Sequence, residues 1–277
     1  MAMMAIIFVL VEEMSWFDSH CHLNGFLEKG ILEEVLDRAS QHEVSRMTAV
    51  GTTPEDWNVY RTLVRKYPER IFCSGGLHPS YVGIDWPSQV AELGKLWDSE
   101  PRPVAVGEIG LDYFRLPKDA DDALVTMEQQ RLAFSHQLSF AKERDLPVIV
   151  HSRNAFEDCL TLIDKSGVNW KKVVFHCFSE GVPQVEQLME RGGRASFTGI
   201  LTFGKNDHLR EAALRQGLEN LMIETDSPYL APEPKRGKVN EPAFLRHLGQ
   251  FAAKLFDVTE DFLAERTFER TCDFYGV

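Results

Sequence analysis

The sequence contains no closely spaced pair of cysteines. Its five cysteines are odd in number and scattered along 277 residues, with no C-x-x-C motif. Disulfide frameworks and cysteine-based zinc sites depend on such pairs, so the sequence argues against both. Scattered free cysteines are typical of a cytoplasmic protein, and we expect that location.

The sequence also lacks an apolar run long enough to cross a bilayer, which takes about 20 residues. The nearest candidate, residues 3–11, resembles the centre of a signal peptide but has no basic start and no small-residue cleavage site. We therefore expect no membrane association. The patterned region begins directly after Met14, so we divide the chain into an N-terminal extension at 1–14 and one domain at 15–277.

Basic residues are too few for a protein that binds nucleic acid over a broad positive surface. Lys and Arg total 30 against 42 Asp and Glu, which gives a net charge of −12. Broad nucleic-acid surfaces depend on Lys and Arg contacts to phosphates. Any contact with nucleic acid is therefore expected to be local.

Short apolar segments with strand character recur eight times, each followed by a segment with helical character. The strand segments are 16–20, 44–50, 71–76, 103–107, 147–150, 172–175, 194–197 and 221–224. Such alternation with apolar strands predicts an α/β fold, a parallel sheet closed into a (β/α)8 TIM barrel, and 242–277 is expected to form two closing helices. An open doubly wound sheet is the alternative, but no nucleotide-binding glycine motif follows the first strand.

Metal-binding side chains gather where the predicted strands end. Barrel active sites lie at the carboxyl ends of the strands. Asp18, His20 and His22 alternate along the first strand, so we expect them to face the same way. Later strand ends supply His78, Glu108, His151, His176 and Asp226. Each residue alone has an ordinary structural interpretation, but five of nine histidines at one rim predict a metal centre.

The order and spacing of these segments resemble the TatD family of metal-dependent hydrolases and deoxyribonucleases. The matching motifs are FDSHCHLNG, GLHP, VGEIGLDY, LPVIVHSR, VVFHCFS and ETDSPYLAPEPKRGKVNEP, which span nearly the whole chain from Ser15. The resemblance implies an amidohydrolase-type barrel with two divalent metal ions, and Asp18 as a supporting neighbour. The ligands it implies are His20, His22 and Asp226 for the first ion, His151 and His176 for the second, and Glu108 as the bridge.

Histidine and carboxylate ligands without a thiolate suit Zn, Mn, Ni or Co better than Mg, which prefers oxygen. The TatD family, which the sequence resembles, is commonly Mg-dependent. Because this disagrees with the preference of the ligands, the metal identity stays open. Two ions would activate water and stabilise both the attacking and the leaving oxygen of a phosphodiester. We assign proton transfer to Asp226, the bridging position to Glu108, and contact with the scissile phosphate to His78.

Few cations are expected near this centre. Arg153 follows His151 on the same strand face, and Lys235 and Arg236 lie in the loop beyond Asp226, so all three are candidates for binding phosphate. A solvated loop is the alternative for Lys235 and Arg236. A small basic patch favours single strands or ends of DNA, so we expect an exonuclease. We assign it the 3'-5' type together with the family resemblance, because the residues themselves do not specify polarity.

Two other functions stay open. The first is a metal-dependent ester or amide hydrolase, such as a D-aminoacyl-tRNA deacylase. Many amidohydrolases bridge their metals with a carboxylated lysine, whereas Glu108 stands here, which favours phosphodiester hydrolysis. The second is a barrel with structural metals that binds a partner, but structural zinc sites are usually closed and cysteine-rich.

Overall fold

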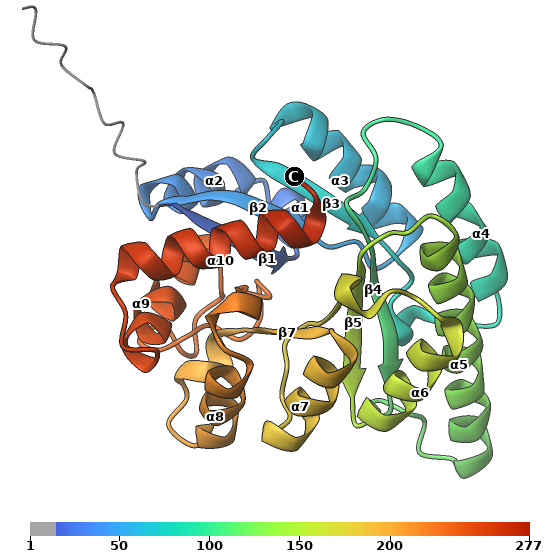
Figure 1. The fold of residues 1–277 in the computed structure, drawn as a ribbon. Coiled ribbons are helices and arrows are strands. Elements are labelled where there is room, and N and C mark those ends of the chain that lie inside the picture. The colour runs from blue at the N-terminus through green and yellow to red at the C-terminus, as the bar shows by residue number, and fades with distance from the viewer. Residues whose placement is uncertain (1–14) are drawn as a thin grey trace, which may run out of the picture.

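The computed structural model describes residues 15–277, and the predicted extension at 1–14 lies outside the described residues. Eight parallel strands stand in chain order and form a nearly closed barrel (Figure 1). They are β1 (Trp16–Cys21), β2 (Val44–Ala49), β3 (Ile71–Gly75), β4 (Ala105–Asp112), β5 (Val148–Arg153), β6 (Val173–Phe175), β7 (Arg194–Phe197) and β8 (Met222–Ile223). The predicted (β/α)8 barrel is confirmed.

Ten helices of the described chain surround the barrel (Figure 1). They are α1 (Asn24–Glu28), α2 (Leu32–Gln41), α3 (Pro54–Lys66), α4 (Trp86–Trp97), α5 (Ala120–Glu143), α6 (Phe156–Ser166), α7 (Val182–Arg191), α8 (Asp207–Gln216), α9 (Leu245–Leu255) and α10 (Glu260–Tyr275). The last two are the predicted closing helices. From residue 15 onward, none of the helices combines the length and apolar character that crossing a membrane requires.

Strands β4 and β5 run further than the sequence predicted. We expected them to end at Gly107 and Val150, but they pair as far as Asp112 and Arg153. Gly110 makes this possible, because its φ is +143° and a Cβ there would collide with the His151 carbonyl oxygen. Close approach of the two backbones therefore extends the ladder. The metal-binding side chains of these strands lie within paired strands, not in loops beyond them.

The end of β1 is joined to the segment that follows β8. The backbone N–H of Asp226 donates to the carbonyl of His20 at 2.9 Å, and the N–H of His22 donates to the carbonyl of Ser227 at 2.8 Å. These hydrogen bonds bring together two parts of the chain that are about 200 residues apart. They also place Asp226 beside the two histidines of β1.

The opposite end of the barrel interior is apolar. Phe17 and Met222, near the starts of β1 and β8, belong to one buried cluster with Phe274 and Tyr275 at the end of α10. The hydroxyl of Tyr275 donates to the carbonyl of Ser19 at 2.8 Å, so its polar group is satisfied. Burial of large side chains here stabilises the barrel without demanding a ligand.

Candidate metal centre

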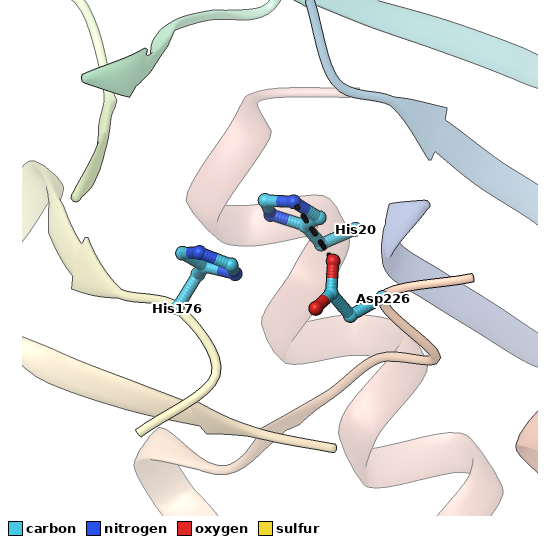
Figure 2. A group of neighbouring side chains, drawn as sticks. All are labelled: His20, His176 and Asp226. Carbon is cyan, nitrogen blue, oxygen red and sulfur yellow. Dashed lines mark ion pairs between the residues drawn. The ribbon is translucent and has the colours of Figure 1, made fainter. Parts of the chain in front are cut away.

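The predicted ligands converge at the carboxyl ends of the strands. Figure 2 shows His20, His176 and Asp226 gathered around one small volume. The rings of His20 and His176 stack with centroids 4.0 Å apart and planes 9° from parallel. Asp226 Oδ1 lies 3.7 Å from His20 Nε2. Segments far apart in the sequence thus deliver groups that are able to share one cation.

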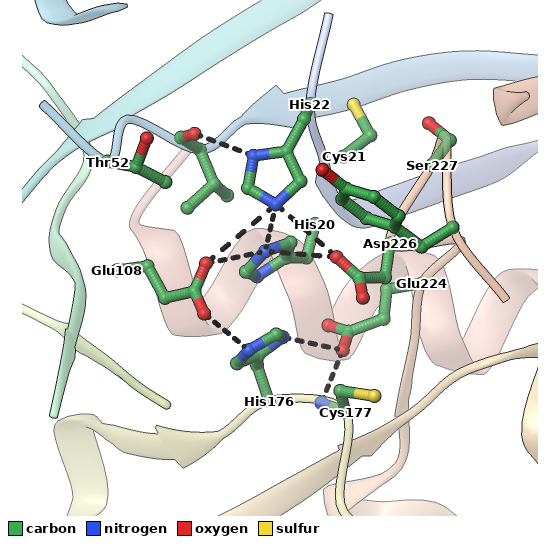
Figure 3. A network of polar contacts seen from close by, with 12 residues as sticks. His20, Cys21, His22, Thr52, Glu108, His176, Cys177, Glu224, Asp226 and Ser227 are labelled. Carbon is green, nitrogen blue, oxygen red and sulfur yellow. Dashed lines mark hydrogen bonds and ion pairs between the residues drawn. The ribbon is translucent and has the colours of Figure 1, made fainter. Parts of the chain in front are cut away.

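Glu108, on β4, lies between His20 and His22 on one side and His176 on the other (Figure 3). Its Oε2 is 3.4 Å from His20 Nε2 and 3.8 Å from His22 Nε2. Its Oε1 faces a second group, with His151 Nδ1 at 2.7 Å, His176 Nε2 at 2.8 Å and His78 Nε2 at 3.2 Å. Only 3% of the Glu108 surface is exposed. A buried carboxylate whose oxygens face different imidazole groups has the arrangement of a ligand that bridges two cations.

Unpaired polar atoms in this cluster fit a metal ion. Asp226 Oδ1 is buried and has no hydrogen-bond partner within residues 15–277, although it lies 3.3 Å from His22 Nε2. His20 Nε2 and His22 Nε2 face each other at 3.4 Å. Such a buried arrangement is costly unless a proton or a cation is shared. Nitrogen and carboxylate donors in this number suit a divalent transition metal, so the residues fit the implied group.

Burial and mutual contact shift the pKa values of the cluster. Burial opposes ionisation of Glu108, yet the His176 and His78 imidazoles hold the pKa of Glu108 well below its usual range. Burial lowers the pKa of His78 to about 4 and also lowers the pKa of His20. Both rings are therefore neutral at pH 7, the form in which imidazole binds metals.

Asp18 does not join His20 and His22 on a common face, so that prediction was wrong. The register of β1 against β2 shifts between Asp18 and Cys21, which interrupts the strict alternation. The Asp18 carboxylate instead accepts hydrogen bonds from the N–H of Thr225 at 2.9 Å and from its hydroxyl at 2.5 Å. Asp18 thereby holds the segment that carries Asp226, which is the position of a supporting neighbour.

Glu224 supports the centre and was not selected from the sequence. Its Oε1 lies 3.4 Å from His176 Nδ1 and accepts the N–H of Cys177 at 2.7 Å, while its Oε2 accepts the hydroxyl of Ser196 at 2.7 Å. Carboxylates behind ligand histidines fix the ring orientation and raise ligand basicity. Its position two residues before Asp226 was the available signal.

Asp112 stands behind His151 in a similar way, with its Oδ2 3.4 Å from His151 Nε2. Its Oδ1 accepts the N–H groups of Phe114 at 3.0 Å and Arg115 at 3.2 Å, which fixes the loop after β4. Sequence analysis missed Asp112 because it ended the strand at Gly107. Once β4 is known to continue, the even spacing from Glu108 places both side chains on one face.

A cavity of about 690 Å³ opens over the cluster. Of the residues that the structure describes, the basic side chains lining it are Arg115 and Arg153. Lys235 and Arg236 are not among the lining residues. The Lys235 ammonium lies 5.1 Å from the centroid of the Phe244 ring, and the Arg236 guanidinium lies 4.3 Å from that of the Phe203 ring. The structure thus brings Arg153 to the centre but not Lys235 and Arg236.

Comparison with known proteins finds relatives over nearly the whole chain. Residues 17–276 match the family described as TatD related DNase. The chain is 38% identical over 254 residues to an uncharacterized metal-dependent hydrolase, YcfH, of Escherichia coli K12, covering 90% of this chain and 91% of YcfH. It is 32% identical over 228 residues to the 3'-5' ssDNA/RNA exonuclease TatD of Erwinia tasmaniensis, covering 80% and 85%.

Solved structures share the fold. YjjV, a TatD homolog from Escherichia coli K12, superposes with a TM-score of 0.85 at 27% identity and covers 95% of this chain and 98% of its own. A phosphotriesterase homology protein from Escherichia coli, solved with phosphate in its active site, gives a TM-score of 0.64 at 13% identity over 93% and 99% of the two chains, which shows the barrel fold alone. The family match over residues 17–276 and these relatives show that the chain belongs to the TatD family of metal-dependent hydrolases.

Proposed function

We propose that this chain is a 3'-5' exonuclease that hydrolyses phosphodiester bonds at the ends of single-stranded DNA with two divalent metal ions, and that it acts in the cytoplasm. The observation that carries the proposal is the place of Glu108 between two histidine groups beneath an open cavity lined by Arg115 and Arg153. The name of the Erwinia relative supports the polarity and the single-stranded substrate.

The candidate ligands divide around Glu108. The residues that would hold the ions are His20, His22, Asp226 and Glu108 on one side, and Glu108, His151 and His176 on the other, with His78 beside them. When bound, two divalent ions supply Lewis acidity that makes water nucleophilic near neutral pH and neutralises charge on a phosphodiester.

Asp226 is the proposed proton carrier. Its buried Oδ1, which lacks a hydrogen-bond partner in the described chain, is placed to accept a proton from the attacking water and to return it to the leaving alkoxide. His78 contacts the scissile phosphate, and Arg153 neutralises that phosphate. Lys235 and Arg236 contact phosphates further along the strand.

Digestion of single-stranded DNA tests this function. With a 5'-end label and added Mn²⁺, Mg²⁺ or Zn²⁺, the wild-type chain is expected to shorten the strand stepwise from its 3' end. Glu108→Ala and His151→Ala are expected to lose at least about 100-fold in rate. His208→Ala is the matched control, because His208 is exposed on α8.

Two results would contradict the nuclease proposal. One is the absence of shortening with every metal, and the other is equal shortening by Glu108→Ala and by the control. Hydrolysis of a D-aminoacyl-tRNA ester without DNA cleavage would move the function to the alternative ester hydrolase while keeping the same centre.

A further inference from the structure

Two tyrosines stand exposed at the cavity over the metal centre. Tyr81 is 55% exposed and Tyr229 is 61% exposed, and both line the cavity. Tyr60 and Tyr275, by contrast, are buried. Large aromatic rings left in water beside a cavity are typical of surfaces that bury them against a ligand. Their position points to a flat, partly apolar group on the substrate.

Each exposed tyrosine lies next to a histidine of the metal-centre cluster. The ring centroids of Tyr81 and His78 are 6.0 Å apart with planes at 64°, and those of Tyr229 and His22 are 6.2 Å apart at 68°. The N–H of Tyr81 donates to the His78 carbonyl at 2.9 Å, and the N–H of Tyr229 donates to the Asp226 carbonyl at 2.9 Å. These hydrogen bonds fix the backbone of both tyrosines next to residues of the cluster.

The two tyrosines come from separate sides of the barrel. Tyr81 ends the short turn Pro79–Tyr81 after β3, and Tyr229 lies in the segment after β8. β3 and β8 are not neighbours in the order of strands. Two rings that reach one cavity from non-adjacent strands are placed to contact a planar group between them or beside either one.

A third group, the guanidinium of Arg153, lies beside the same cavity. Arg153 lines the cavity, and its Cζ lies 3.8 Å from the centroid of the Phe114 ring. In residues 15–277 this guanidinium makes no hydrogen bond or ion pair with a protein group. Phe114 is 60% exposed, and its N–H is held by Asp112. A guanidinium stacked on a ring and free at its edge is available to bind a phosphate.

We propose that Tyr81 and Tyr229 form a base clamp that stacks on the unpaired base of the terminal nucleotide, while Arg153 on Phe114 binds the scissile phosphate that joins this nucleotide to the strand. This inference rests on the proposed exonuclease function and names what makes it selective for single strands. Every base offers a π-face, so the clamp tolerates any sequence. A base paired within a duplex is already stacked and is not free to enter.

The test compares binding of the metal-loaded protein to two strands of equal length, one of thymidine nucleotides and one abasic, by fluorescence anisotropy, with phosphorothioate linkages in both strands to slow cleavage. The wild-type chain is expected to bind the thymidine strand about 5- to 100-fold more tightly, the range of one or more base–aromatic contacts. Tyr81→Ala and Tyr229→Ala are expected to reduce that ratio, and Tyr81→Phe and Tyr229→Phe to keep it.

Phe262→Ala is the matched control for loss of an aromatic ring. Phe262 is also exposed, lies beside Arg266 on α10 and does not line the cavity, so its removal is expected to leave the binding ratio unchanged. Equal affinity of the wild-type chain for both strands would overturn the clamp. An unchanged ratio in both alanine variants would overturn it as well.

Rates of hydrolysis measured on the same preparations show which of the two proposals fails, the base clamp or the nuclease function. The substrates are phosphodiester versions of the thymidine strand and of the abasic strand, which has the same diesters and no planar group. If the wild-type chain cleaves neither, the nuclease proposal fails, and the binding ratios alone decide the clamp. If it cleaves both strands and the alanine variants slow only the thymidine strand, both proposals stand. If the alanine variants slow neither, the clamp alone fails.

Discussion

The two ends of the barrel interior are built from opposite kinds of side chain. At the amino-terminal end, Phe17 packs against Phe268 and Tyr275 in a cluster whose polar hydroxyl is satisfied. At the carboxyl end, Glu108 and Asp226 are buried among histidines, and some polar atoms have no partner in the described chain. Apolar packing is complete in itself, whereas buried charges need a counter-charge. The first end therefore contributes stability and the second contributes chemistry.

Metal removal is expected to show the largest difference between the two ends. Hydrolysis at the carboxyl end should be lost, while the fold held by the apolar end stays intact. A chelator should reduce phosphodiester hydrolysis by on the order of 10³-fold or more, because the carboxyl end then lacks its counter-charge and its Lewis acid. The far-ultraviolet circular dichroism spectrum at 25 °C should not change, because the apolar end holds the barrel. Unfolding on chelation would contradict this division.

Phe17→Ala tests the packing of the apolar end. Phe17 is buried at 1% exposure, so its truncation is expected to reduce the free energy of unfolding by about 3–5 kcal/mol. Urea denaturation measures this loss, and Phe262→Ala, at an exposed ring, is the control. Metal affinity at 25 °C should stay close to that of the wild type. A large loss of affinity with little loss of stability would show that the two ends are not independent.

Glu224→Gln tests the support of the polar end. The amide keeps an acceptor for the N–H of Cys177 but removes the negative charge 3.4 Å from His176 Nδ1. The expected result is a 10- to 100-fold weaker affinity for one metal ion, measured by titration calorimetry, which is the usual effect of losing such a carboxylate. Glu190→Gln, on the exposed face of α7, should change nothing.

Asp158→Asn tests a charged group outside both ends and should have the smallest effect. Arg131 donates to Asp158, as does the Tyr113 hydroxyl at 2.8 Å, and the contact with Arg131 holds the pKa of Asp158 below its usual 3.8. A depressed folded-state pKa gives stability that is present above the unfolded pKa and lost as pH falls through the folded value. Because the pair is partly exposed, we expect at most about 1 kcal/mol at pH 7.

Urea denaturation at pH 7 and at pH 3 checks this dependence. The difference in unfolding free energy between the wild type and Asp158→Asn should shrink at the lower pH. A difference that grows on acidification would contradict the assigned direction of the pKa.

The barrel was predictable because its signal is local and repeated. Each strand segment is a short apolar run before a helical pattern, and such periodicity does not depend on distant contacts. The lengths of β4 and β5 do depend on them. Their extension requires the close approach at Gly110, which no pattern within either strand reveals. The direction of Asp18 was predicted wrongly for a related reason, because a register shift against β2 interrupts the alternation.

The site residues also divide into those that local spacing predicted and those that depend on contacts between distant parts of the chain. The spacing of His20 and His22 indicated their shared direction, and the structure brings both to Asp226 and Glu108. Asp112 was missed because the predicted strand ended at Gly107, and Glu224 was missed because it supports a histidine from another part of the barrel. Such a role follows from how neighbouring strands are aligned, which one-dimensional spacing does not specify.

The number of metal ions bound by the wild-type chain and by Glu108→Gln tests the central claim most directly. Glu108 is the one carboxylate of the described chain whose two oxygens face the two histidine groups. The expected result is two ions per wild-type chain, at most one in the variant, and a folded protein in both cases. Two ions of unchanged affinity in Glu108→Gln, or none in the wild type, would contradict a metal centre bridged by this residue.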